Sequence, residues 1–115
     1  MEGTRMMADV MEMGDEMLSF EIIAAAGSAR SLSFEALAAA KAGDFARADE
    51  LMSQADAADL EAHSMQTSLL VKEANGDHTP VDVMLVHAQD HLMCAMLAHE
   101  LIGELIELHR TKVGA

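Results

Sequence analysis

A chain of 115 residues has room for one domain, and its formal net charge of −13 excludes nucleic acid as a partner, because phosphate-backbone binding relies on clustered Lys and Arg. Hydrophobic residues make up 51% of the chain, which argues against disorder, yet Trp and Tyr are absent, so the core must be built from Ala, Leu, Ile, Val and Met. No uncharged apolar run is long enough to cross a bilayer and no compact signal core is present, which predicts a soluble, cytoplasmic protein without direct membrane insertion.

The first helix is predicted to follow a short lead-in. Residues 1–14 are rich in Met and show no period, so we interpret them as a flexible lead-in to one domain over 15–112. From Asp15 apolar residues recur at intervals of three and four, which is typical of one helix face. Gly43 can adopt the left-handed conformation that ends a helix, and Asp44 can cap the next one.

The second helix is predicted from Phe45 to about Ala74, with an Ala-rich seam that suits a bundle. Its acidic residues are interpreted as a solvated face, because no His or Cys completes a metal-binding spacing among them. They are Asp49, Glu50, Asp56, Asp59 and Glu61. His63, Gln66 and Thr67 form a polar strip beside the seam. His63 is therefore either a supporting residue of a nearby site or a histidine hydrogen-bonded between helices.

The third helix is predicted to begin with Thr79 as N-cap, Pro80 in the first turn and acidic Asp82 behind it, and to continue to about Arg110. Three long helices, two short loops and no credible strand predict an all-α antiparallel three-helix hairpin bundle. Since small side chains limit the apolar area that one chain can bury, we also expect burial between subunits.

One broad face of this third helix carries the polar groups that call for an explanation. It comprises Val83, His87, Asp90, Cys94, Leu97, Leu101, Leu105 and Leu108. We expect the face to be buried, with Cys94 as a small packed hydrophobe. A buried carboxylate at Asp90 is costly unless it is paired or bound to a cation, and His87 lies one turn away from it. From spacing alone, two hypotheses are equally good: a chemically active His87, or a noncatalytic helical interaction bundle in which His87, His91 and Asp90 ligate a transition metal.

Five blocks of the sequence together carry a family resemblance. They are residues 26–31, 35–37, 43–45, 62–67 and 87–93, the last reading His-Ala-Gln-Asp-His-Leu-Met. In this order they resemble the enzyme IIA component of the lactose/cellobiose/diacetylchitobiose family of the bacterial phosphoenolpyruvate-dependent sugar phosphotransferase system. The resemblance implies a phosphotransferase component that assembles as a homotrimer, a nine-helix bundle.

The same resemblance implies the site and the partners. His87 would be the nucleophile that becomes a tele-phosphohistidine, and Asp90 would bind a divalent cation, expected to be Mg²⁺, shared among three subunits. His63, Gln66, Gln89 and His91 would support the phosphoryl group or orient the ring. The donor would be the histidine-containing phosphocarrier protein, and the acceptor a cysteine of the cognate enzyme IIB, which serves the membrane component IIC in β-disaccharide uptake. The sugar itself stays open.

Overall fold

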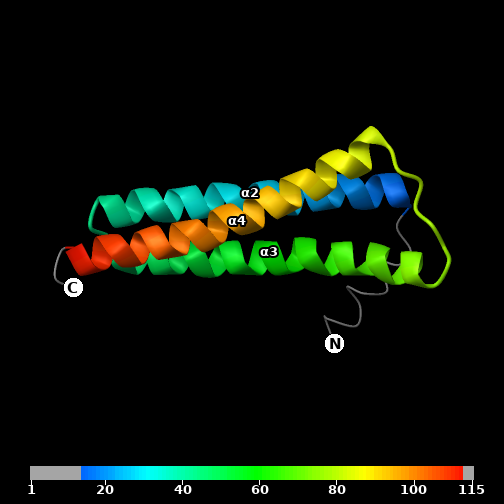
Figure 1. The fold of residues 1–115 in the computed structure, drawn as a ribbon. Helices are drawn as coiled ribbons and strands as arrows, with labels where there is room; N and C mark the ends of the chain where they lie inside the picture. The colour runs from blue at the N-terminus through cyan, green and yellow to red at the C-terminus, as the bar shows by residue number, and fades with distance from the viewer. Residues whose placement is uncertain (1–13, 113–115) are drawn as a thin grey trace, which may run out of the picture.

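The computed structural model describes residues 14–112, which form three antiparallel helices, α2 (Asp15–Lys41), α3 (Phe45–Ala74) and α4 (Val83–Lys112), as Figure 1 shows. No strand occurs in this range, so the predicted all-α three-helix hairpin is confirmed. Residues 1–13 of the predicted lead-in lie outside the described residues. No helix within 14–112 combines the length and the apolar character that crossing a membrane requires.

The turn between α2 and α3 forms as its sequence predicts. Gly43 has φ 84°, and its amide donates to Ala40 O at 3.0 Å while the Asp44 amide donates to Ala39 O at 2.9 Å. These two bonds satisfy carbonyls at the end of α2 that have no partner within the helix. The Asp44 carboxylate then accepts a hydrogen bond from Arg47 N at 3.1 Å and caps α3. Both predicted functions of this short turn are confirmed.

The start of α4 differs from the prediction. The helix begins at Val83, and its cap is Asp82, whose carboxylate accepts from Leu85 N at 2.8 Å and whose carbonyl accepts from Val86 N at 3.1 Å. Thr79 is not the cap: its amide donates to Glu73 Oε2 at 3.3 Å, toward the end of α3. Two residues able to cap lie three positions apart, and the one whose side chain reaches a helix amide sets the boundary.

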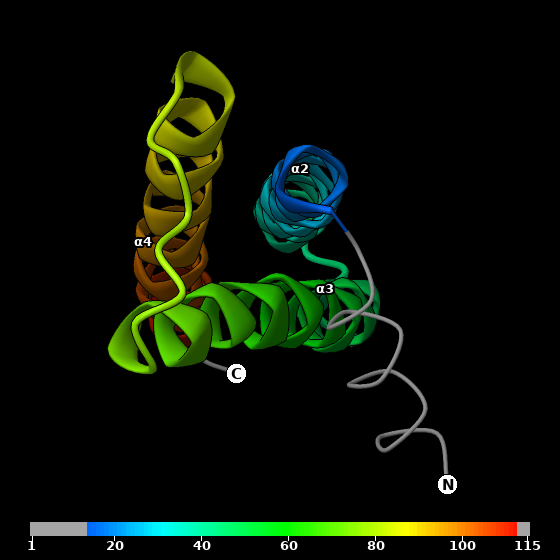
Figure 2. The ribbon, with the colours of Figure 1, turned by 90° about the vertical axis from the view of Figure 1, so that its right-hand side faces the viewer.

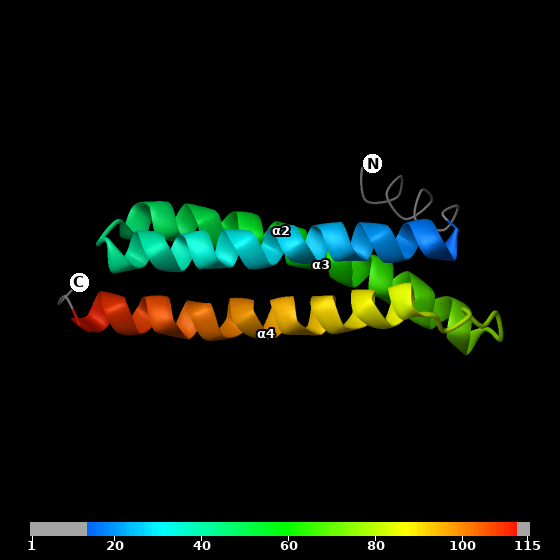
Figure 3. The same ribbon diagram turned by 90° about the horizontal axis from the view of Figure 1, so that it is seen from above.

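Helix α2 is the central element of the bundle. It packs more extensively against α3 and against α4 than these two pack against each other. Figure 3 shows α2 lying over α3 along much of its length, with α4 running alongside. The core divides into two clusters along the long axis: one around Ile22, Met65 and Leu92, and the other around Leu51 and Ile102. Because buried Ala side chains line α2, neighbouring helices can approach it closely.

The two helices flanking α2 diverge at one end of the bundle. Figure 2 shows the first turns of α4 standing away from the last turns of α3, with the connecting segment bridging the separation. A single ion pair between Lys72 Nζ and Asp15 Oδ1, 3.1 Å long, ties the end of α3 to the start of α2. The hydrogen bond to Asp15 raises the pKa of the Lys72 ammonium. Because α4 diverges from α3 here, the first turns of α4 have fewer neighbours than the rest of that helix.

The face of α4 that was expected to be buried is exposed in the single chain. Val83 is 86% exposed, Leu97 57% and Leu101 54%, and His87, Asp90 and Cys94 are exposed as well. The helix instead packs through another set of residues: Ala88, Leu92, Ala95, Ile102 and Ile106. Both sets recur at helical spacing, so α4 has two apolar faces, and the face with small residues fits closer to the Ala-lined α2.

The cap assignment leads to a prediction on stability. Asp82→Ala should lower the free energy of unfolding by about 1 kcal/mol, because the Leu85 amide loses its acceptor. Thr79→Ala is the matched control and should cost less, because the Thr79 hydroxyl has no hydrogen-bond partner in the described chain. Urea denaturation of both variants measures the difference. A larger loss for Thr79→Ala than for Asp82→Ala would contradict the assignment.

Candidate functional site

His87 and His91 lie one turn apart near the start of α4. Each histidine is directly followed by a fully buried residue, Ala88 and Leu92 respectively, so packing of α4 against the core fixes the direction in which both histidines leave the helix. The His87 side chain is exposed, whereas His91 is half-buried. Their rings are stacked, with centroids 5.8 Å apart and planes inclined by 9°. The helix thus presents one imidazole to solvent and supports it with a second, nearly parallel one.

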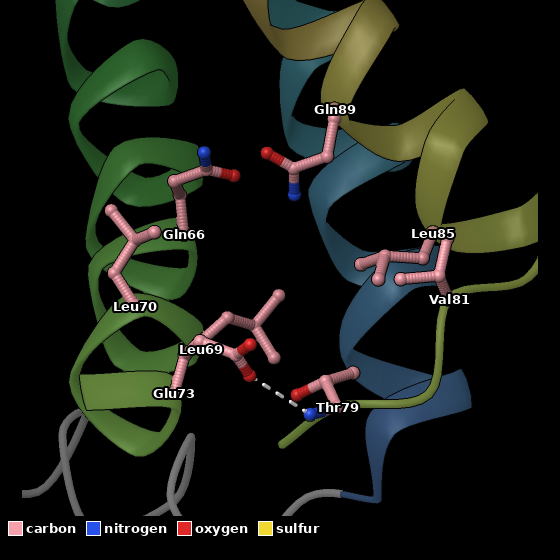
Figure 4. A pocket seen from close by; sticks show the side chains of 8 residues that line it. All are labelled: Gln66, Leu69, Leu70, Glu73, Thr79, Val81, Leu85 and Gln89. Atoms are coloured by element: carbon pink, nitrogen blue, oxygen red, sulfur yellow. Dashed lines mark hydrogen bonds between the residues drawn. The ribbon is translucent and has the colours of Figure 1, made fainter. Parts of the chain in front are cut away.

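Two predicted supporting residues meet at a cavity of about 160 Å³ between α3 and α4. Figure 4 shows the side chains of Gln66 and Gln89 pointing toward each other across it. The hydrogen bond from Thr79 N to Glu73 lies at one end of this cavity, and Leu69 lines its apolar part. The Gln66 Oε1 atom is buried without a hydrogen-bond partner in the described residues. The two amides therefore face each other across the cavity, with no hydrogen bond between them in the described residues.

The third supporting candidate does not join this group. His63 is exposed on α3, and its carbonyl accepts a hydrogen bond from the Thr67 hydroxyl at 3.0 Å. Within residues 14–112 no hydrogen bond or ring contact connects His63 to His87. The predicted polar strip is therefore divided, with only Gln66 directed into the space between α3 and α4.

Asp90 lies on the exposed apolar face of α4, and Cys94 Sγ is 3.8 Å from its Oδ1. The expectation of a packed thiol is wrong for the single chain, because Cys94 is exposed. Over the range 14–112, no three His, Cys, Asp or Glu side chains of one chain converge to hold a metal ion. A transition-metal site made of His87, His91 and Asp90 within one subunit is therefore not supported.

A contact between ionisable side chains of α3 and α4 was not predicted from the sequence. His99 lies with Nε2 3.1 Å from Asp56 Oδ1 and Nδ1 3.5 Å from Asp59 Oδ2. The interpretation of Asp59 as part of a solvated face is therefore wrong: its side chain is only 16% exposed, and burial raises the pKa of its carboxyl, an effect that His99 opposes. Spacing within α3 held no signal for this contact, because the histidine comes from another helix.

The geometry as a whole suits transfer of a small group to or from the exposed ring. A neutral imidazole is a nucleophile near neutral pH and can hold a group covalently for a time. An exposed ring on a helix face can be reached by a second protein, whereas a buried one cannot.

Comparison with known proteins places the chain in a family. The model of the family described as PTS system, Lactose/Cellobiose specific IIA subunit, matches residues 17–110. A lactose-specific EIIA component of Streptococcus mutans is 52% identical over 94 residues, which cover 82% of this chain and 90% of that protein. An N,N'-diacetylchitobiose-specific EIIA component of Escherichia coli is 53% identical over 88 residues, 76% of each chain.

Solved structures agree in fold. The cellobiose-specific enzyme IIA from Bacillus anthracis aligns with a TM-score of 0.85 at 44% identity, covering 89% of this chain and 94% of that one. The IIA subunit in the solution structure of the chitobiose IIA complex with HPr aligns with a TM-score of 0.75 at 48% identity, covering 87% and 96%. On this likeness in sequence and structure, the chain belongs to the lactose/cellobiose-specific IIA family of the sugar phosphotransferase system.

Proposed function

We propose that this protein accepts a phosphoryl group on His87 from HPr, the histidine-containing phosphocarrier protein, and passes it to a cysteine of its cognate enzyme IIB in the cytoplasm. The observation that carries the proposal is the exposed His87 imidazole, stacked on His91, at the surface of a IIA fold. HPr as donor is supported by the relative solved in complex with HPr at 48% identity. Through enzyme IIB, the group would reach the membrane component IIC during uptake of a β-disaccharide.

The chemistry that follows is an exchange of one bond for another. The Nε2 lone pair of a neutral His87 attacks phosphorus, the new nitrogen–phosphorus bond forms, and the bond from phosphorus to the donor's histidine breaks. The donor ring leaves as an imidazole, taking up the proton that the accepting ring gives away. In the second step a cysteine thiol of enzyme IIB gives up its proton and attacks the same phosphorus as the thiolate. The sulfur–phosphorus bond forms, the bond from phosphorus to His87 breaks, and the His87 ring takes up the proton and leaves as a neutral imidazole. Alignment of two docked proteins supplies most of the acceleration.

The role of His87 can be tested by substitution. His87→Ala should abolish phosphoryl acceptance when the protein is incubated with phosphoenolpyruvate, enzyme I and HPr, because no other side chain presents the reacting nitrogen. His63→Ala is the control, since no hydrogen bond or ring contact joins His63 to His87 in the described chain, and it should keep normal stoichiometry. His91→Ala should retain some acceptance. Mass spectrometry measures the adduct, and its acid lability distinguishes phosphohistidine from phosphoserine.

A normal amount of base-stable, acid-labile phosphoprotein from His87→Ala would assign the nucleophile to another histidine. Circular dichroism of each variant checks that the loss does not arise from unfolding. The substituted positions are not in the buried core, so all three variants should keep the helical spectrum of the parent.

The homotrimer is the second part of the proposal, and the exposed face of α4 supports it. Leu97, Leu101 and Leu105 continue the row that holds Asp90 and Cys94, and a soluble single chain seldom exposes so long an apolar row. Three copies of one helix face packed about a common axis would bury this row. The core of one subunit is small and rich in Ala, so the added burial matters for stability.

A charge placed in this row should therefore dissociate the assembly. Leu101→Glu should give a monomeric mass at micromolar concentration, because three carboxylates would be forced together without water. Leu60→Glu, which adds the same charge to a leucine 67% exposed on α3, is the matched control and should leave the trimer intact. Light scattering measures the masses. A monomeric parent protein, with a divalent cation present, would refute the trimer.

A divalent cation at Asp90 is the third part. One subunit supplies one exposed carboxylate at this position, with the Cys94 thiol donating toward it. Carboxylate oxygens suit Mg²⁺, whereas a thiol does not, so Asp90 and its two symmetry mates would be the ligands. The ion would neutralise three like charges held close together within an apolar interface. The ion would stabilise the trimer and would take no part in phosphoryl transfer at His87.

Replacing Asp90 by an apolar residue tests this idea. Asp90→Leu should leave the trimer as stable as the parent or more stable, because it removes both the repulsion and the need for the ion. Chelator should lower the melting temperature of the parent and leave that of Asp90→Leu unchanged. Thermal melts of both proteins, with and without chelator, measure this. A parent insensitive to chelator, together with a dissociated Asp90→Leu subunit, would refute the shared ion.

A further inference from the structure

Gly27 stands in the middle of α2 without a conformational reason for being glycine. The positive-φ glycines of the described chain are Gly43 and Gly76, both at helix ends, so Gly27 has ordinary helical geometry. Its neighbours on the same helix include Ala25, Ala26 and Ala29. An alanine at position 27 would favour the helix by about 1 kcal/mol relative to glycine. The reason for a glycine at position 27 must therefore be steric and lie in the residue that occupies the space beside it.

That space is occupied by a histidine of the site. A Cβ atom built on Gly27 would lie 3.4 Å from Nε2 of His91, at the inner limit of ordinary van der Waals contact. The edge of the His91 ring thus rests against the backbone of α2. An added methyl group would just fit, whereas a branched side chain such as that of valine adds two more carbon atoms beside a Cβ that already touches the ring. Gly27 therefore determines how close to α2 the His91 ring can lie.

The position of His91 matters because its ring stacks on His87. The two planes are inclined by only 9°, and their centroids are 5.8 Å apart. Within residues 14–112, no hydrogen bond to the His87 ring is present, and the stack on His91 is a contact that opposes rotation of that ring. Transfer between two docked proteins requires the ring nitrogen to point along the line of attack. The His91 ring thus lies between the backbone of α2 at Gly27 and the exposed His87 ring.

We propose that Gly27 is a positioning residue for His87, acting by letting the His91 ring seat against α2 and stack on the reacting ring. Only the predicted effect on the rate of phosphoryl transfer rests on the proposed function. The structural part of the proposal is that a larger side chain at position 27 turns the His87 ring by displacing His91. This part applies to the unphosphorylated protein and can be measured there.

The experiment compares two glycines that lie within helices. Gly27→Val should shift the imidazole ¹H and ¹⁵N resonances of both His91 and His87, and slow phosphoryl acceptance from phosphorylated HPr by about tenfold or more, since small misplacements cost rate steeply. Gly103→Val is the matched control, because its nearest neighbour is the movable end of Met52 at 3.7 Å. It should change neither the His87 resonances nor the rate. Gly27→Ala, which just fits, should keep most of the rate.

A double-mutant cycle decides whether Gly27 acts through His91. In the His91→Ala background there is no ring to displace, so Gly27→Val should cause no further loss of rate. An equal loss in that background would overturn the proposal and place the effect of Gly27 in direct packing or docking. Unchanged His87 resonances in a helical Gly27→Val protein would also overturn it. If Gly27→Val fails to fold, Gly27→Leu takes its place in the comparison of imidazole resonances. Gly27→Ala must then shift the His87 and His91 resonances in the same direction by a smaller amount.

Failure of the proposed function would look different. If the parent protein accepts no phosphoryl group from HPr, the carrier role is refuted, whereas the ring resonances of Gly27→Val still decide the positioning role. If the parent is phosphorylated and Gly27→Val reacts at the parent's rate, the carrier role stands and the positioning role falls.

Discussion

The orientation of α4 about its own axis is the constraint on which the other features depend. Ala88, Leu92 and Ala95 pack inward because α2 presents a row of buried alanines that admits a close neighbour. With these residues inside, His87 and Asp90 must face outward. A rotation of α4 by one residue, about 100°, would bury His87 against the core and expose Leu92. The small side chains of α2 therefore determine which side chains the molecule presents to solvent.

Much of the fold could be predicted because its signals are local. The end of α2 at Gly43 and the cap at Asp44 need only a few neighbouring residues, and both are confirmed. The start of α4 was predicted three residues early, because Thr79 and Asp82 are both good caps and the choice depends on contacts with Glu73 in another helix. Local sequence determines which boundaries are possible, and tertiary contacts select among them.

The rest of the site could be predicted only in part. Helical periodicity identified two residues of one face, His87 and Asp90, but it does not distinguish an apolar face that packs within the chain from one that stays outside. The contact of His99 with Asp56 and Asp59 was missed for a related reason, since it joins two helices. The place of Gly27 within a helical pattern likewise does not identify the residue that lies next to it. That its neighbour is a site histidine follows only from the fold.

The uneven burial along α4 has a consequence for its motions. Near the C-terminal end, Ile102 and Ile106 are held in a core cluster with α2 and α3, whereas the first turn at Val83 and Val86 is exposed and stands apart from α3. Backbone amides of that first turn should therefore exchange with solvent through small local openings, while those around Ile102 require more extensive unfolding. His87 directly follows this exposed first turn and directly precedes Ala88, which belongs to the core. In the proposed carrier role, this local opening would let the segment adapt to one protein surface and then to another of different shape while the far end of the bundle stays closed.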